Sequence, residues 1–219
     1  MSVVREEFGP TLPELLGERL RVSPRTIWRV LAAAGVLVVL VVAWLAFVRG
    51  TPGQDAVVVR EPIAYNLVHT DALRRATPRA GETLRLETRA GAAPQSFAVK
   101  PLHLAPYKGD VSASLTLLSA RLIREMAAQY PGFLWRGDGR VNINKQPGYQ
   151  IVFQARIGGR TTYGKRVLLV AAPDPPPREG LDITMLSARS PAVPRADAVA
   201  ANGALKTPYR SLRFGTDRP

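Results

Sequence analysis

The sequence predicts an α+β protein with one N-terminal transmembrane helix, followed by a mainly antiparallel β-sheet that two helices cover. Three observations support this prediction. Residues 30–48 form an uncharged apolar run, residues 110–130 carry apolar side chains at steps of three and four, and several other segments alternate apolar and polar side chains between tight-turn sequences. Because strands that follow one another through tight turns must be antiparallel, the class is α+β.

The apolar run at residues 30–48 is predicted to be a membrane-spanning helix. At about 1.5 Å per residue it spans about 28 Å, close to the hydrocarbon thickness of a bilayer. Ser23 and Pro24 supply a helix start signal, so the predicted helix covers residues 24–49. The predicted membrane-interface residues are Trp28, Arg29, Trp44 and Arg49. A buried core helix is the alternative, although such a helix usually keeps a polar face.

Basic residues near this run predict its orientation. Five arginines lie on its N-terminal side, and only two lie in the first twenty residues beyond it. We therefore expect residues 1–23 to be a cytoplasmic tail and the C-terminal part to lie outside a cell membrane that the chain crosses once. A cleavable signal peptide is the alternative, but its apolar core is normally about 7–15 residues long.

Composition narrows the classes of partner and chemistry. The chain has no cysteine, which excludes disulfides, a thiol nucleophile and a thiolate metal site. Its net charge is +13, of which the first 29 residues contribute only +1. Such an excess can favour phospholipid headgroups, anionic envelope polymers or nucleic acid, although the predicted topology argues against nucleic acid. The alternative is the composition of a GC-rich genome, because 25 of the 30 basic residues are Arg.

Residues 50–62 are predicted to form a linker, within which residues 57–59 could add an edge strand. The extracytoplasmic α+β domain is predicted over residues 63–215, before a short tail at 216–219. Its first part is predicted to contain a strand at 65–69, a single helical turn capped by Thr70 and Asp71, a strand at 84–88, and a strand at 97–104 interrupted at Pro101.

The strongest helix prediction outside the apolar run covers residues 110–130. Apolar side chains recur along one face from Val111 to Tyr130, Asp110 can cap the start, and Pro131 and Gly132 end the helix. One face of this helix should therefore pack on the sheet.

The second half of the domain is predicted to be mostly strands. Strands at 133–136 and 141–143 flank a predicted tight turn at residues 137–139. A clear hairpin follows, with strands at 149–157 and 161–170 joined by Gly158 and Gly159. A strand at 181–188, a helix at 195–205 and a last strand at 211–214 complete the prediction.

The hairpin GYQIVFQARIGGRTTYGKRVLLV, the strand LDITMLSA and the ending YRSLRF carry a resemblance to a known superfamily. They are similar to the closing half of PsbP-like domains, the Mog/PsbP superfamily, over residues 63–215. The chain also resembles uncharacterised actinobacterial proteins anchored by one N-terminal span. This resemblance implies a PsbP-like α/β/α sandwich and an accessory or binding role, and it transfers no catalytic residue. A lipobox cysteine and a tryptophan near the start of such domains are missing.

No catalytic, cofactor-binding or metal-binding residue is predicted. Residues 159–165 match most of a phosphate-binding loop, but Arg166 replaces the required Ser or Thr and a strand follows instead of a helix. His69 and His103 lie in separate strand-like segments without metal-ligand spacing, although they could meet in space. No Gly-x-Ser-x-Gly elbow occurs.

The function predicted first is a non-enzymatic, membrane-anchored envelope protein that binds a protein partner or an anionic envelope component. Tyr107, Phe133 and Trp135 form the candidate binding surface. No cofactor is expected, and the sequence leaves the oligomeric state open. Two alternatives remain: an extracytoplasmic enzyme that acts on cell-wall or lipid material through acidic residues distant in sequence, and a sensor that couples the outer domain to the cytoplasmic tail.

Overall fold

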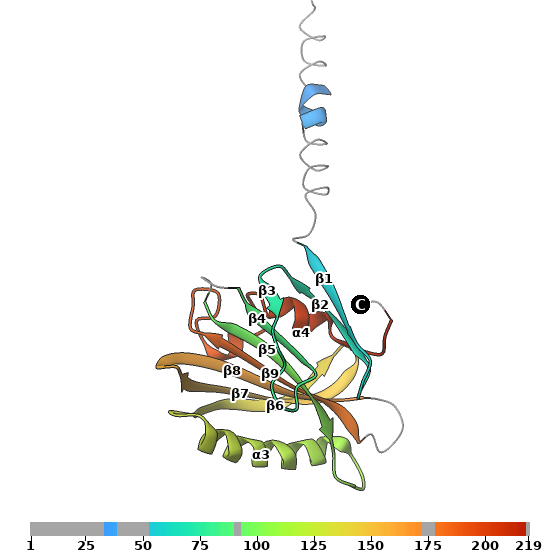
Figure 1. The fold of residues 1–219 in the computed structure, drawn as a ribbon, viewed down its shortest axis with the longest axis vertical. Coiled ribbons are helices and arrows are strands. Elements are labelled where there is room, and N and C mark those ends of the chain that lie inside the picture. Colours follow the sequence, from blue (N-terminus) through green and yellow to red (C-terminus); the bar gives the residue numbers. More distant parts are fainter. Residues whose placement is uncertain (1–32, 39–52, 90–92, 172–177, 218–219) are drawn as a thin grey trace, which may run out of the picture. The chain divides into compact units, whose positions relative to one another are not determined.

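The computed structural model of the chain describes residues 33–38, 53–89, 93–171 and 178–217 (Figure 1). The chain divides into two compact units, Met1–Thr51 and Pro52–Pro219. In the first unit, residues 33–38 are helical and exposed. The rest of the predicted span, including Trp28, Arg29, Trp44 and Arg49, lies outside the described residues. Within the described ranges, no helix is both long and apolar enough to cross a membrane.

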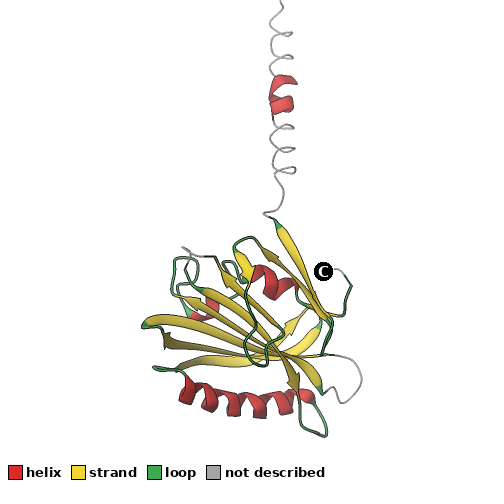
Figure 2. Cartoon of the chain, in the orientation of Figure 1, coloured by secondary structure: helices red, strands yellow, loops and turns green. Residues whose placement is uncertain are grey.

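The second unit contains two antiparallel sheets, drawn as arrows in Figure 2. A seven-stranded sheet has the order β3-β4-β5-β9-β8-β7-β6, and a three-stranded sheet has the order β1-β2-β10. The strands are β1 (Gln54–Val59), β2 (Tyr65–Thr70), β3 (Leu73–Arg75), β4 (Leu84–Thr88), β5 (Gln95–His103), β6 (Leu134–Ile143), β7 (Gln146–Ile157), β8 (Arg160–Val170), β9 (Glu179–Ala188) and β10 (Arg213–Phe214). Every strand pair is antiparallel, which confirms the predicted α+β class.

The long helix α3 (Val111–Gln129) covers one face of the large sheet and confirms the prediction for residues 110–130 (Figure 1). Asp110 caps it by accepting a hydrogen bond from the Ser112 amide at 2.9 Å. Its buried apolar side chains pack mainly on β7, in a cluster that includes Phe153. Phe153 is fully buried, and its ring stacks on both Tyr130 and Phe133, with centroid separations of 5.7 and 5.5 Å.

A second apolar cluster joins the large sheet to the remaining elements. It combines side chains of β1 and β2, such as Val57 and Leu67, with large-sheet residues such as Ile183. Residues from the short helix η1 (Ala196–Ala198) and from the approach to α4 (Lys206–Ser211) complete it. A small sheet and two short helices therefore contribute to this cluster, in place of one long covering helix.

Several predictions in the first half need correction. The edge strand suggested at residues 57–59 is present but longer: residues 54–59 of the predicted linker form β1, paired along its whole length with β2, so the packed unit includes residues before 63. The helical turn predicted after Thr70 is wrong, because residues 73–75 form β3 and pair with β4. Strand β5 continues through Pro101, opposite Leu181. This is possible because β4 pairs only with residues 96–99, so no strand on that side needs the missing N–H of Pro101.

The turn predicted at residues 137–139 is also wrong. Residues 134–143 form one strand, β6, with an irregularity in its pairing with β7 between Trp135 and Gly137. Gly137, at φ 153°, adopts a backbone conformation that other residues rarely take, which fits a bulge. The chain turns instead at Asn144 and Lys145, which both have positive φ, as a tight hairpin connection requires.

The helix predicted at residues 195–205 is replaced by a single 3-10 turn, η1, and the true helix α4 lies later, at Lys206–Ser211. Ala200 has a φ of 62°, which interrupts helical backbone. Buried Val199 and Leu205 join the core cluster, so packing of this segment outweighs its helical composition.

Tyr65 gives the fold a predictable response to alkaline pH. Burial raises its pKa to about 12, against smaller lowering effects from its hydrogen bond with Thr83 and from the Arg75 charge. Between about pH 10 and 12 the folded chain keeps a proton that the unfolded chain loses, so stability should fall as pH rises through this range, by on the order of 2 kcal/mol. Urea denaturation at several pH values measures this. The Tyr65→Phe variant should lose this part of the pH dependence, and an identical slope in both proteins would contradict the assignment.

Candidate functional site

The described residues include a cleft of about 540 Å³ that arginines dominate. Its lining comes from β4, β5 and the loops that flank β4, from the ends of β7, β8 and β9, and from the C-terminal end of α3. We call it the arginine cleft, after the four arginines in its lining: Arg79, Arg85, Arg89 and Arg160. Its volume lies in the range of about 300–1,000 Å³ that small-molecule sites occupy.

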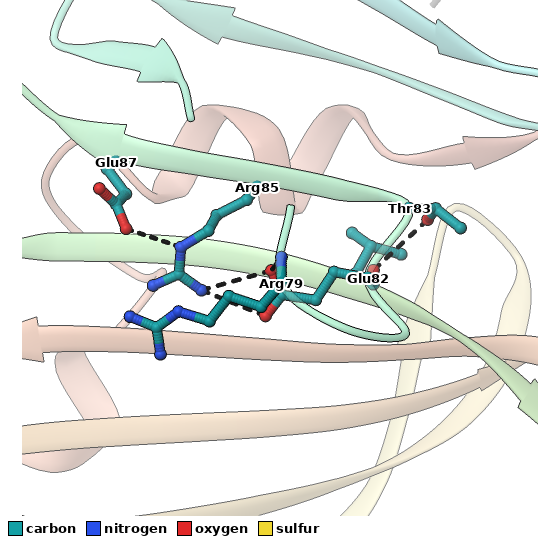
Figure 3. A network of polar contacts seen from close by, with 6 residues as sticks. Arg79, Glu82, Thr83, Arg85 and Glu87 are labelled. Carbon is teal, nitrogen blue, oxygen red and sulfur yellow. Dashed lines mark hydrogen bonds and ion pairs between the residues drawn. The ribbon is translucent and has the colours of Figure 1, made fainter. Parts of the chain in front are cut away.

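Arg85 is held in place by two carboxylates (Figure 3). The alternation of β4 puts Arg85 and Glu87 on the same face of the sheet, and the Arg85 Nε donates to Glu87 Oε1 at 2.6 Å. Its Nη1 lies 3.1 Å from Glu82 Oε1. Arg85 is 8% exposed, so these two acids compensate a buried charge.

Glu82 also shapes the loop at the rim of the cleft. Glu82 Oε2 accepts the backbone N–H of Arg79 at 2.9 Å, and the Glu82 amide donates back to the Arg79 carbonyl. The Thr83 amide then bonds the Val99 carbonyl of β5, which ties this loop to the sheet. The loop that carries Arg79 is therefore fixed by hydrogen bonds.

The other three arginines of the cleft are exposed, and none of them forms an ion pair with any residue that the structure describes. They are Arg79, Arg89 and Arg160. Arg85 with Glu82 and Glu87 carries a net charge of −1, and the other three arginines add +3, so the cleft has a positive surplus of +2. Partly buried apolar side chains, including Tyr130, Ile157 and Leu186, form another part of the lining. The arrangement suits a ligand that carries anionic groups.

A second cleft, of about 570 Å³, lies beside β6, β7 and η1 and has a different electrostatic character. Its lining includes two arginines and two aspartates, although the Asp138 carboxylate bonds the Tyr149 hydroxyl on the α3 face. Arg195 pairs with Asp197 at 2.8 Å, and Arg136 donates to the Gln154 side chain at 2.7 Å. The arginine cleft therefore has the larger surplus of charge.

The structure places Tyr107 and Phe133, two residues of the predicted binding surface, at opposite ends of α3. Tyr107 precedes α3 and Phe133 follows it, so the nineteen-residue helix stands between them. Tyr107 and Phe133 are half-buried and pack against the apolar cluster under α3, whereas Trp135 on β6 is 55% exposed. Whether this set binds a partner stays a prediction.

The other residues considered from the sequence have structural surroundings. His69 is buried in β2, with its Nδ1 3.1 Å from the Thr70 carbonyl, whereas His103 is exposed at the end of β5 in the other sheet. Gly158 and Gly159 both have positive φ and turn the chain into β8, so residues 159–165 are a turn and a strand. No group of three or more potential metal ligands gathers among the described residues.

Sequence reasoning missed the arginine cleft because Arg160 of β8 is far along the chain from the other three arginines, which lie within eleven residues around β4. The available signal was the alternation of Arg85 and Glu87 in a short strand, which predicts that they share a face. Glu82 and Glu87 are the two carboxylates that meet at this site, and both bind the same guanidinium. They therefore hold Arg85, which leaves the predicted catalytic acid pair without support here.

No family model matches the sequence, and no curated protein matches it at a significant level. Similar solved structures include PA94, a protein of unknown function from Pseudomonas aeruginosa, with 19% identity, a TM-score of 0.37, and coverage of 64% of this chain and 84% of that chain. The cyanobacterial PsbP protein (CyanoP) of Synechocystis sp. PCC 6803 has 10% identity, a TM-score of 0.49, and coverage of 76% and 95%. LpqN, involved in cell envelope biogenesis of Mycobacterium tuberculosis, has 10% identity, a TM-score of 0.48, and coverage of 74% and 91%. Similar structures thus include a PsbP protein and a cell-envelope protein, while membership of this chain in the PsbP superfamily and an actinobacterial origin stay predictions.

Proposed function

We propose that this chain is a membrane-anchored, non-enzymatic binding protein of the cell envelope whose arginine cleft binds an anionic envelope component. The observation that carries the proposal is the surplus of positive charge in one cleft. Three arginines that form no ion pair with a described residue line it, and a fourth is paired with Glu82 and Glu87. The uncharged run at residues 30–48 supports anchoring of this domain outside the membrane.

Arginine side chains favour phosphate or carboxylate ligands for a geometric reason. A guanidinium is planar and can donate two parallel hydrogen bonds to one phosphate or carboxylate group. Arg79, Arg89 and Arg160 can therefore contact separate anionic groups of one ligand. Arg85 binds the carboxylates of Glu82 and Glu87, which reduces their repulsion of an anionic ligand. A polymer with repeated phosphates, or a phosphorylated headgroup, has this chemistry.

The test measures binding of a glycerol phosphate oligomer to the full chain in neutral detergent micelles. The triple variant R79A/R89A/R160A should bind more weakly, by roughly tenfold to a hundredfold if each exposed contact contributes about 0.5–1 kcal/mol. Salt should weaken binding by the wild type more than binding by this variant, because salt screens exposed charges. Isothermal titration calorimetry gives both results.

The matched control is R124A/R210A/R213A, which removes the same charge from exposed positions outside the arginine cleft. This variant should keep most of the affinity. Equal losses in both triple variants would mean that net charge attracts the oligomer without a site, and absence of binding by the wild type would refute the proposed ligand class.

A further inference from the structure

Strand β6 forms the long open edge of the large sheet. All of its ten residues except Arg136 pair with β7 on one side, and no described strand pairs with the other side. The opposite edge, β3, is only three residues long. Leu134 and Trp135, at the start of β6, are 49% and 55% exposed. An open edge of this length presents backbone N–H and C=O groups to another strand.

Two charged side chains of β6 lie on the same face of the sheet. Asp138 is opposite Ile151 of β7, and Arg140 is opposite Tyr149. Ile151 and Tyr149 both belong to the apolar cluster under α3, so Asp138 and Arg140 project on the α3 face. Asp138 accepts a hydrogen bond from the Tyr149 hydroxyl at 2.5 Å, which helps to fix its carboxylate.

We propose that two copies of this chain pair through β6, antiparallel and with Gly139 on the two-fold axis. In this register Asp138 of each copy lies opposite Arg140 of the other, so that two pairs of opposite charge form across the junction. The contact is isologous, since the same residues serve both copies, and the two seven-stranded sheets become one continuous sheet.

Charge complementarity selects this register over its neighbours. If the axis passed through residue 138, the two Asp138 side chains would lie opposite each other. If the axis passed through residue 140, the two Arg140 side chains would lie opposite each other. Like charges directly opposite each other destabilise a strand pair. A shift of the register by one residue would place side chains of the α3 face of one copy opposite side chains of the other face of its partner. Only the arrangement centred on Gly139 pairs unlike charges and keeps both α3 helices on one side.

The local backbone allows close approach at the axis. Gly139 does not have a positive φ, and a Cβ added there would meet no heavy atom within 4 Å. The bulge between Trp135 and Gly137 limits regular pairing to the residues that follow it. The exposed Trp135 side chain then lies just outside the paired segment. The predicted junction is therefore short and centred on residues 137–141.

The absence of cysteine allows a direct test by disulfide cross-linking. In the full chain at micromolar concentration in neutral detergent, Gly139→Cys should form a covalent dimer under mild oxidation. The register control is Val141→Cys, because two copies of residue 141 would lie about 14 Å apart, beyond the roughly 7 Å limit for a disulfide. Ala120→Cys on the exposed side of α3 controls for random collision.

Dimers that form much faster in the Gly139→Cys protein than in both controls support the proposal. Equal rates in the three proteins, or no dimer in the Gly139→Cys protein, would overturn it. This test does not depend on the arginine cleft, which shares no residue with the proposed junction. Its outcome is therefore separate from that of the binding experiment.

Charge reversal gives a second test that uses no cross-link. Arg140→Glu puts one glutamate opposite each Asp138, so that two like-charged pairs form, and the dimer dissociation constant measured by sedimentation should rise by roughly tenfold or more. Adding Asp138→Lys restores unlike pairs and should recover part of that loss, although the hydrogen bond from Tyr149 is removed. If the double variant dimerises no better than Arg140→Glu, the proposed register is wrong.

Discussion

Asp182→Ala is expected to lower the free energy of unfolding by about 3–5 kcal/mol, because it leaves a buried guanidinium without its partner. Asp182 of β9 binds Arg166 of β8 in a bidentate ion pair, with Nε to Oδ1 at 2.9 Å and Nη2 to Oδ2 at 2.5 Å. The two side chains are only 10% and 18% exposed. Burial lowers the pKa of Arg166, but the hydrogen bond and charge of Asp182, together with the charges of Tyr130 and Glu125, raise it above its ordinary value.

A second Arg–Asp pair on the surface provides the control. Arg195 and Asp197 form an ion pair with side chains 78% and 62% exposed, so Asp197→Ala should cost less than about 1 kcal/mol. Urea denaturation of both variants gives the comparison. Arg166→Met with Asp182→Leu should recover much of the loss, since apolar residues can replace a buried pair. Similar losses for Asp182→Ala and Asp197→Ala would show that burial of the pair does not matter.

Gly164→Ala should also destabilise the fold strongly, by about 3 kcal/mol, because β8 leaves no room for a side chain at this position. A Cβ built on Gly164 would lie 2.1 Å from Phe153 Cζ. The Phe153 ring cannot move aside easily, since it is fully buried and stacks on Tyr130 and Phe133. Thermal and urea denaturation measure the loss.

Gly139→Ala is the matched control for this prediction, because its new methyl group would meet nothing within 4 Å. Its stability should stay within about 1 kcal/mol of the wild type, allowing for the lower β-propensity of Gly. The double variant G164A/F153L should recover part of the Gly164→Ala loss by shortening the obstructing side chain. If Gly164→Ala were as stable as Gly139→Ala, the Phe153 ring would have to move away from the new methyl group without lowering the free energy of unfolding, and the prediction would be wrong.

The sequence predicted elements whose side-chain periodicity agrees with their final packing. Helix α3 has its apolar stripe on the sheet, and the β7–β8 hairpin turns at Gly158 and Gly159 as expected. Prediction failed where local composition disagreed with the tertiary structure. Gly137 accommodates a bulge rather than a turn, and residues 195–205 pack as irregular chain around Val199.

The candidate site was much harder to predict than the fold. Arg79, Arg89 and Arg160 are ordinary exposed arginines in a chain that has 25 of them, and nothing in their local sequence distinguishes them. They form a site only because β4, β5, β9 and β8 are consecutive neighbours in the sheet, which places Arg160 near the two loops that flank β4. That information lies in strand order, which side-chain periodicity does not encode.

The pairing of β10 with β2 affects how the chain can assemble as it is made. Phe214 lies opposite Tyr65, the Asn66 side chain donates to the Gly215 carbonyl at 3.0 Å, and the Val68 amide donates to Ser211 Oγ at 2.8 Å. These contacts join residues almost 150 positions apart, which is a slow closure for a polypeptide. The small sheet can therefore be completed only after residues 211–215 have emerged from the ribosome, and from the membrane if the chain crosses one. Until then β2 has a partner on one side only, and its other edge is open to a chaperone or to misassembly.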